Sequence, residues 1–235
     1  MQQWQLRCQQ EETLWKQKSR IQWLKEGEQN TKFFHRSALD YRGANKILFL
    51  NNEEGETFQS HQEVATLLTR HFNNIAQEPE VNRAEEIEEL TQAIPKLITN
   101  EQNLALRREV SLEEVEEAVR SMPNDKAPGP NGFTINFYKA CWSFVKTDVW
   151  EVVEYSQRSS SILKSLNSTF LALVPKEEEA NSPEKFRPIS LCNVIYKIIS
   201  KVIANRLKPI LPGLISEEQS GYVEGRQIVN NILLA

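Results

Sequence analysis

Apolar residues recur at helical spacing in several stretches of the chain. Residues 193–208 are predicted to form an amphipathic helix. At about 100° of rotation per residue, the apolar side of this helix carries Val194, Ile198, Ile199, Val202 and Ile203. Ser111 and Glu114 form a capping box, which predicts that another helix begins at residue 112. The pattern also predicts helices over residues 4–26, 60–76 and 133–159, and the start of one at residue 227. Residues 77–110 are rich in glutamate and predict surface helices and a linker.

Two regions of the chain favour extended structure instead. Lys46–Leu50 and Thr57-Phe58 flank the turn sequence NNEEGE and predict a hairpin near residues 46–58. Residues 167–174 (NSTFLALV) form the best predicted strand, and the turn-rich segment after them leads to a return limb that contains Pro188. Proline lacks a backbone donor, so the return limb should be an edge or irregular strand. The predicted fold class is α+β, mainly helical, with a small antiparallel hairpin sheet.

Composition narrows the class of protein. The chain has 235 residues, 40% hydrophobic and 26% charged, which is typical of one or two globular domains and excludes a disordered or collagen-like chain. No apolar run reaches the roughly 18 residues that a membrane span needs, so no membrane partner is expected, and the N-terminus does not resemble a secretory signal. Three separated cysteines argue against a disulfide framework or a zinc site and indicate an intracellular, reducing location.

Charge is distributed unevenly. Residues 1–50 carry nine basic and five acidic residues, residues 51–120 carry six and sixteen, and residues 121–235 carry thirteen and eleven. The segment 185–216 contains six basic residues and no acidic one, and Lys197, Lys201 and Lys208 share one side of the predicted helix. Such a segment is either a solvated basic face or a patch that binds phosphate.

Two cations stand on the two limbs of the second predicted hairpin. Lys176 follows the first limb, and Arg187 lies on the return limb. A lysine supplies a point charge and an arginine supplies a planar fork, so together they suit a polyanion such as a triphosphate. The alternative is that both are ordinary surface cations.

Several motifs resemble reverse transcriptases of non-LTR (LINE-type) retrotransposons, especially those of plants. They are KAPGPNGFTINFYKACW, LNSTFLALVPK and FRPISLCNVIYKIISKVIANRLKPILPGLISEEQSGYVEGRQI, and the segment WKQKSRIQWLKEGEQNTKFFH resembles the region that precedes the polymerase. The resemblance implies a partial right-hand polymerase with fingers and the start of the palm. It divides the chain into an N-terminal extension, residues 1–110, and the first part of the polymerase domain, residues 111–235.

The resemblance also assigns roles to individual residues. It implies that Lys176 and Arg187 contact the triphosphate of the incoming dNTP, with Lys185 as a competing candidate because the hairpin register is not fixed by the sequence. It places Gln219, Gly221 and Arg226 beside an RNA template. The other candidates for nucleic-acid binding are Lys126, Lys197, Lys201 and Lys208. Partners implied for the intact enzyme are RNA template, DNA primer and dNTP, with Mg²⁺ as cofactor.

The metal-binding aspartates of that family are not found. The chain has three aspartates, Asp40, Asp125 and Asp148, and no Asp-Asp pair. Two-metal nucleotidyl transfer depends on carboxylate ligands, so no catalytic or metal-ligating residue is assigned, and the chain alone is predicted to be inactive. The expectation is a polymerase fragment that ends before the catalytic palm strands. Two alternatives remain, a residual nucleic-acid-binding module and a non-functional relic of a decayed element.

Overall fold

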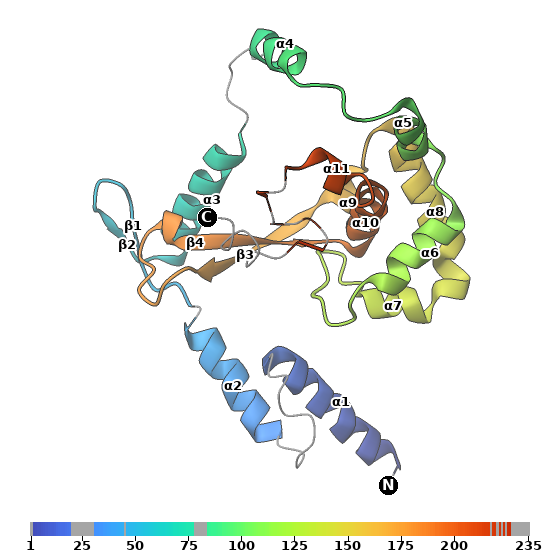
Figure 1. Ribbon diagram of the computed structural model, residues 1–235. Coiled ribbons are helices and arrows are strands. Elements are labelled where there is room, and N and C mark those ends of the chain that lie inside the picture. Colours follow the sequence, from blue (N-terminus) through green and yellow to red (C-terminus); the bar gives the residue numbers. More distant parts are fainter. Residues whose placement is uncertain are drawn as a thin grey trace. The chain divides into compact units, whose positions relative to one another are not determined.

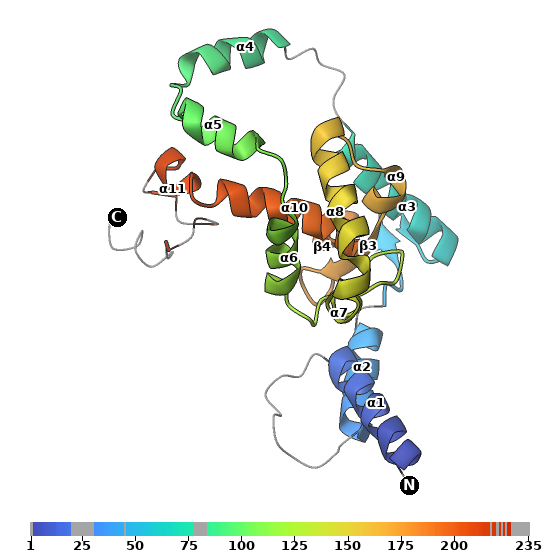
Figure 2. The ribbon, with the colours of Figure 1, turned by 90° about the vertical axis from the view of Figure 1, so that its right-hand side faces the viewer.

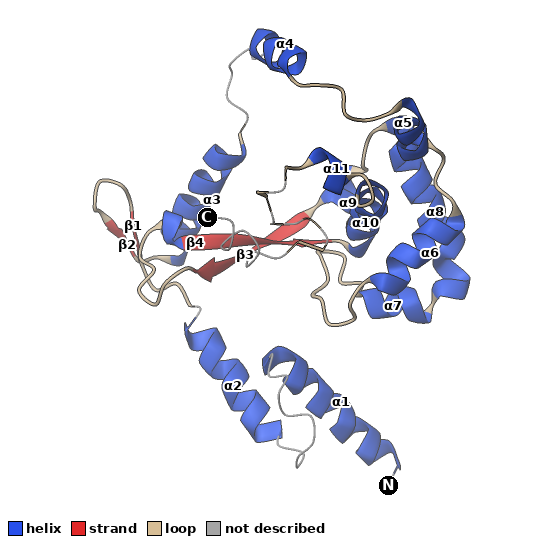
Figure 3. Ribbon diagram, viewed as in Figure 1, coloured by secondary structure: helices blue, strands red, loops and turns tan. Residues whose placement is uncertain are grey.

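The computed structural model describes residues 2–19, 31–44, 46–77, 84–216, 218, 219, 221, 223, 225 and 226. Within this part the chain is mainly helical and has two two-stranded sheets, which confirms the predicted class (Figures 1 and 3). Its contacts divide the chain into two compact units. Unit 1 comprises residues 1–78 and 172–189, and unit 2 comprises residues 79–171 and 190–235. None of the described helices is long and apolar enough to cross a membrane.

Unit 1 begins with the helices α1 (Gln2–Ser19) and α2 (Thr31–Ala44). They pack against each other, with the rings of Trp15 and His35 in edge contact and their centroids 4.2 Å apart. The predicted helix over 4–26 is confirmed as far as Ser19. Its remainder, residues 20–26, lies outside the described part of the chain, as does the helix predicted from residue 227.

A short hairpin and one helix supply most of the core of unit 1. Strands β1 (Leu50–Asn51) and β2 (Thr57–Phe58) pair antiparallel, with Leu50 opposite Phe58, which confirms the predicted hairpin. Helix α3 (His61–Ala76) begins with a capping box between Ser60 and Glu63. Its apolar face packs on the hairpin, and the buried cluster consists of Leu50, Val64, Leu67, Leu68 and Phe186.

The second hairpin consists of β3 (Thr169–Pro175) and β4 (Phe186–Cys192), joined through the short 3₁₀ turn η1 (Pro183–Lys185). Phe186 and the half-buried Leu173 belong to the core of unit 1. The bounds of β3 confirm the predicted strand over 167–174 to within two residues. Because Leu173 and Phe186 pack in this core, they hold the tip of the hairpin in place.

Unit 2 contains the remaining helices. They are α4 (Ala84–Ala93), α5 (Asn100–Arg107), α6 (Leu112–Ser121), α7 (Ile135–Ala140), α8 (Trp142–Ser159), α9 (Lys164–Asn167), α10 (Val194–Leu207) and α11 (Leu211–Leu214). Helices α6, α8 and α10 pack against one another (Figure 2). The predicted capping box of Ser111 and Glu114 opens α6. The fully buried residues at the centre of this core are Val115, Ala118 and Ile198.

Three details of the predicted helices are wrong. The helix expected over 133–159 is broken at Cys141, whose φ of −98° and ψ of 14° end α7 and begin α8. The aromatic residues between positions 133 and 150 favour packing in the core, yet Phe144 is 84% exposed. Ile203, expected on the buried side of α10, is 54% exposed. Tertiary packing therefore covers a narrower stripe of each helix than the apolar pattern suggests.

Candidate nucleic-acid interface

The register of the second hairpin places its cations. The backbone N–H of Lys176 donates to the carbonyl of Lys185 at 2.8 Å, so these two residues lie opposite each other. Continuing the antiparallel pairing puts Val174 opposite Arg187. Side chains alternate between the two faces of a strand, and Phe186 is buried while Arg187 is exposed. Lys176, Lys185 and Arg187 therefore share the face of the hairpin that points away from the core of unit 1.

The three cations differ in the partners they already have. The ammonium of Lys176 donates to the carbonyl of Glu184, and Lys185 pairs with Glu177 at 2.6 Å. The Lys185 pair is about half exposed, so it is worth little and can exchange. Arg187 makes no side-chain hydrogen bond or ion pair among the described residues. Arg187 is thus the cation of this hairpin that is most available to an anionic ligand.

The connection between the two strands is acidic, which changes where an anion can bind along the hairpin. Residues 176–185 contain four glutamates and two lysines. A hydrogen bond from the Ser182 hydroxyl lowers the pKa of Glu184, helped by its own backbone N–H and by the nearby charges of His71 and Lys176. Glu184 therefore stays ionised beside Lys176. An anion would be repelled at the tip of the hairpin and favoured along β4, near Arg187.

A second group of cations lies in unit 2, where α10 meets the loop that follows α6. The ammonium of Lys197 donates to the carbonyl of Ala127 at 2.9 Å. That bond puts the exposed Lys126 next to α10, whose Lys201 is half-exposed. Lys208 follows the last turn of the helix and is exposed. The structure therefore brings Lys126, Lys197 and Lys201 into one neighbourhood.

This loop is fixed to the start of α10 by a close contact. Gly129 is buried, and a Cβ at its position would lie 2.3 Å from the backbone nitrogen of Asn193. The Asn193 side chain is 1% exposed, accepts from the N–H of Asn131 at 3.1 Å and donates to carbonyls of residues 165, 166 and 168. Only glycine permits this approach, because any Cβ would overlap backbone atoms. The KAPGPNG motif is thus a docked loop rather than a free connector.

The three template-side candidates lie in the loop after α11. The guanidinium of Arg226 donates to four main-chain carbonyls, those of Pro212, Ile215, Ser216 and Gln219. Gln219 is exposed, and Gly221 is half-buried. Arg226 therefore organises this loop, and its contact with a template stays a prediction.

Sequence reasoning missed the most extensively bonded charged residue of unit 2. Arg206 has a side chain only 9% exposed and forms a two-pronged ion pair with Glu114, at 2.9 Å for both bonds. It also donates to the carbonyls of Leu106, Arg108 and Glu109. This arrangement lowers the pKa of Glu114 to about 2, mainly through the hydrogen bonds from Arg206, against the opposing effect of burial. A signal existed, because position 206 continues the buried stripe of Ile199 and Val202.

The described residues do not form a two-metal carboxylate site. No group of three histidine, cysteine, aspartate or glutamate residues in that part of the chain could hold a metal ion. Asp40 in α2, Asp125 after α6 and Asp148 in α8 are all exposed and come from separate elements. The part of the chain that the structure describes therefore does not fit the pair of metal ions used by nucleotide polymerases.

Comparison with known proteins confirms the resemblance to non-LTR reverse transcriptases. Residues 174–234 match the family model described as reverse transcriptase (RNA-dependent DNA polymerase). The chain is 29% identical over 219 residues to the transposon TX1 uncharacterized 149 kDa protein of Xenopus laevis, covering 92% of this chain and 16% of that protein. It is 27% identical over 128 residues to the probable RNA-directed DNA polymerase from transposon BS of Drosophila melanogaster, covering 52% and 14%.

A third relative is the retrovirus-related Pol polyprotein from the type-1 retrotransposable element R2 of Bradysia coprophila. It is 33% identical over 97 residues, which cover 41% of this chain and 11% of that protein. The chain thus spans less than a fifth of the length of each of these three relatives.

Proposed function

We propose that this chain carries the first part of an RNA-directed DNA polymerase of a non-LTR retrotransposon, with β3 and β4 as the fingers hairpin over the nucleotide. Residues 1–110 would be the extension before the polymerase, and residues 111–235 the fingers and the start of the palm. The intact polymerase would use an RNA template, a DNA primer, dNTP and Mg²⁺. The chain's own contribution would be to hold the triphosphate and the template.

One observation carries the proposal. Arg187 lies on β4, inside the stretch that matches the reverse transcriptase model, and is exposed without a side-chain partner among the described residues. Lys185 and Lys176 lie on the same face of that hairpin, within reach of the same ligand. A planar guanidinium with all its donors available can bind two phosphate oxygens at once.

Replacing Arg187 by alanine should weaken triphosphate binding. A charge-assisted hydrogen bond contributes about 1.5–3 kcal/mol, so the dissociation constant of a fluorescent dNTP should rise about tenfold or more. Arg187→Lys should restore part of the affinity, because it returns the charge without the fork. Fluorescence anisotropy with the full chain measures this.

The matched control is Arg158→Ala. Arg158 is 71% exposed, pairs among the described residues only with Glu154 four positions earlier, and lies in the other unit. Its replacement should leave dNTP affinity unchanged. Equal losses for the two variants, or no loss for Arg187→Ala, would contradict the assignment of the hairpin to the nucleotide.

The chain alone should not extend a primer. No described cluster of carboxylates could hold the metal ions that activate the primer hydroxyl and the leaving pyrophosphate. In a primer-extension assay with RNA template, Mg²⁺ and dNTP, incorporation should equal that of a no-protein control. Metal-dependent incorporation by the purified chain would show that carboxylates of this chain assemble a site.

A second candidate function, RNA binding by itself, is favoured by the contact between Lys197 and the loop that carries Lys126. Three neighbouring cations, Lys126, Lys197 and Lys201, can neutralise phosphates of a single strand. For single-stranded RNA, the slope of log K against log salt should then be about −2, since each phosphate contributes about −0.7. A filter-binding titration from low to moderate salt measures this slope.

Single substitutions refine this salt test. Lys126→Ala and Lys201→Ala should each make the slope shallower by about 0.7, because each removes one phosphate contact. Lys164→Ala, an exposed lysine on α9, is the control and should leave the slope unchanged. A flat salt dependence for the unaltered chain would argue against this function.

A further inference from the structure

Helix α4 and the segment after it expose an apolar stripe. Ile87, Leu90 and Ile94 are spaced by three and four residues, so they share one side of the helix, and they are 59–64% exposed. Leu97 and Ile98 continue the apolar surface and are 54% and 43% exposed. So large an apolar surface on one short segment usually marks an interaction site. A second apolar surface that packs on this stripe would remove its side chains from water.

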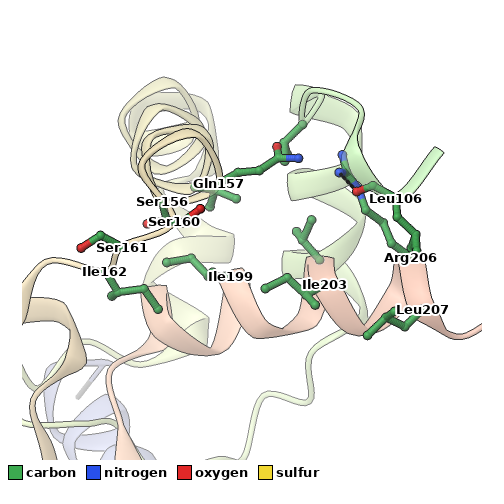
Figure 4. A pocket seen from close by; sticks show the side chains of 13 residues that line it. Leu106, Ser156, Gln157, Ser160, Ser161, Ile162, Ile199, Ile203, Arg206 and Leu207 are labelled. Atoms are coloured by element: carbon green, nitrogen blue, oxygen red, sulfur yellow. Dashed lines mark hydrogen bonds between the residues drawn. The ribbon is translucent and has the colours of Figure 1, made fainter. Parts of the chain in front are cut away.

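An open apolar cavity lies in the same unit. It has a volume of about 450 Å³ and lies between α8, α10 and the end of α5 (Figure 4). Its apolar lining includes Leu106, Val153, Ile199, Ile203 and Leu207. Ile203 and Leu207 are 54% and 36% exposed, although they lie on α10, whose other side is buried in the core of unit 2. This cavity is an apolar surface of the kind that an amphipathic helix covers.

The charges around the two surfaces are opposite. Helix α4 has the sequence AEEIEELTQA, with four glutamates and no basic residue. A hollow that adjoins the cavity, and shares Leu106, Val202 and Arg206 with it, is lined by four basic and two acidic residues. One of the two carboxylates, Glu114, is already paired with Arg206. Electrostatic attraction therefore favours α4 over a neutral or basic helix as the occupant.

The connection between α4 and the cavity is short enough for docking within one chain. Residues 94–99 join α4 to α5, and Leu106 near the end of α5 lines the cavity. Six extended residues span up to about 20 Å, and α5 is about 12 Å long, so α4 can fold back to the cavity. A short tether gives an effective concentration in the millimolar range, which favours the helix of the same chain over that of a second copy.

We propose that α4 docks in this cavity of its own chain, with Leu90 and Ile94 against Ile203 and Leu207. The docked helix shields the exposed apolar residues of α10 and brings the net negative charge of α4 close to the basic hollow that contains Lys201 and Arg108. This acidic strap does not depend on the proposed polymerase function.

Disulfide trapping in the full chain tests the strap. In a chain whose Cys8, Cys141 and Cys192 are alanine, the pair Leu90→Cys and Ile203→Cys should form an intramolecular disulfide about tenfold faster than a control pair. The control combines Glu88→Cys with Ile203→Cys, since Glu88 lies on the opposite side of α4 from Leu90. Tryptic mass mapping identifies the cross-linked peptides. Equal rates for the two pairs, or cross-links between two chains, would overturn the proposal.

Hydrogen exchange on the chain with its native cysteines gives a second readout. Leu90→Glu should speed amide exchange in residues 84–93 and 199–207 by about tenfold, because both helices lose their cover. Leu104→Glu is the control, since Leu104 is 71% exposed on α5 and does not line the cavity. Exchange in residues 199–207 that is the same in Leu90→Glu as in the native chain would also overturn the strap.

Discussion

Gly129→Ala is expected to destabilise unit 2 by at least about 3 kcal/mol. An added Cβ would lie 2.3 Å from the backbone nitrogen of Asn193 and 2.5 Å from the carbonyl carbon of Cys192. Both are main-chain atoms, so no side-chain rotation can relieve the overlap. The loop would have to leave the start of α10, which would also break the hydrogen bond between Asn131 and Asn193. Urea unfolding measures the change in the free energy of unfolding.

Gly213→Ala is the matched control for this experiment. Gly213 lies in α11 of the same unit, and a Cβ there would have no atom within 4 Å. That substitution should leave the free energy of unfolding unchanged or raise it by up to about 1 kcal/mol. If Gly129→Ala proves as stable as the native chain, the loop is not docked as described.

Arg206→Ala should be the other severe substitution, with a loss of about 3–5 kcal/mol. Among the described residues, it would leave Glu114 with only the exposed Arg108 as an ion-pair partner, and it would remove the Arg206 donor from the carbonyls of Leu106 and Glu109. The carbonyl of Arg108 would keep the side-chain amide of Gln157 as its donor. Arg206→Lys should restore less than half of the loss, because an ammonium cannot reproduce the planar fork. Denaturant unfolding at pH 7 compares the three proteins.

The pH dependence separates this ion pair from a simple packing role. The pKa of Glu114 is lowered to about 2 in the folded chain from an ordinary value of 4.5, so the pair's contribution is complete above pH 4.5 and is lost as the pH falls toward 2. The stability difference between the native chain and Arg206→Ala should therefore shrink over this window. A difference that stays constant with pH would point to lost packing alone.

Features set by neighbouring residues could be predicted from the sequence. The capping box at Ser111 and the strand before Lys176 depend on residues a few positions apart, and the structure has them. The ion pair of Arg206 with Glu114 spans 92 residues, and its partner choice depends on how α6 and α10 cross. No local pattern in the sequence specifies how these two helices cross. The position of Arg206 on the apolar stripe of α10 indicates only that its side chain is buried, and it does not identify the partner.

The candidate nucleotide site shows the same division. The sequence predicted a hairpin with cations on both limbs, since strand propensity and turn residues are local properties. Which cation is available depends on partners made by the folded connection, such as the pair of Lys185 with Glu177. That pairing reduces the availability of Lys185 and leaves Arg187 as the main candidate.

Pro188 of β4 has a consequence for how this chain behaves among copies of itself. Lys176 and Lys185 form a hydrogen-bonded pair, and such pairs alternate with non-bonded ones along an antiparallel ladder, so Pro188 falls at a non-bonded position opposite Leu173. The N–H that proline lacks would therefore have pointed outward from the two-stranded sheet. The ladder with β3 stays intact, while the free border of β4 offers one donor fewer to a foreign strand. Pro188 thus acts as a guard against edge-to-edge aggregation.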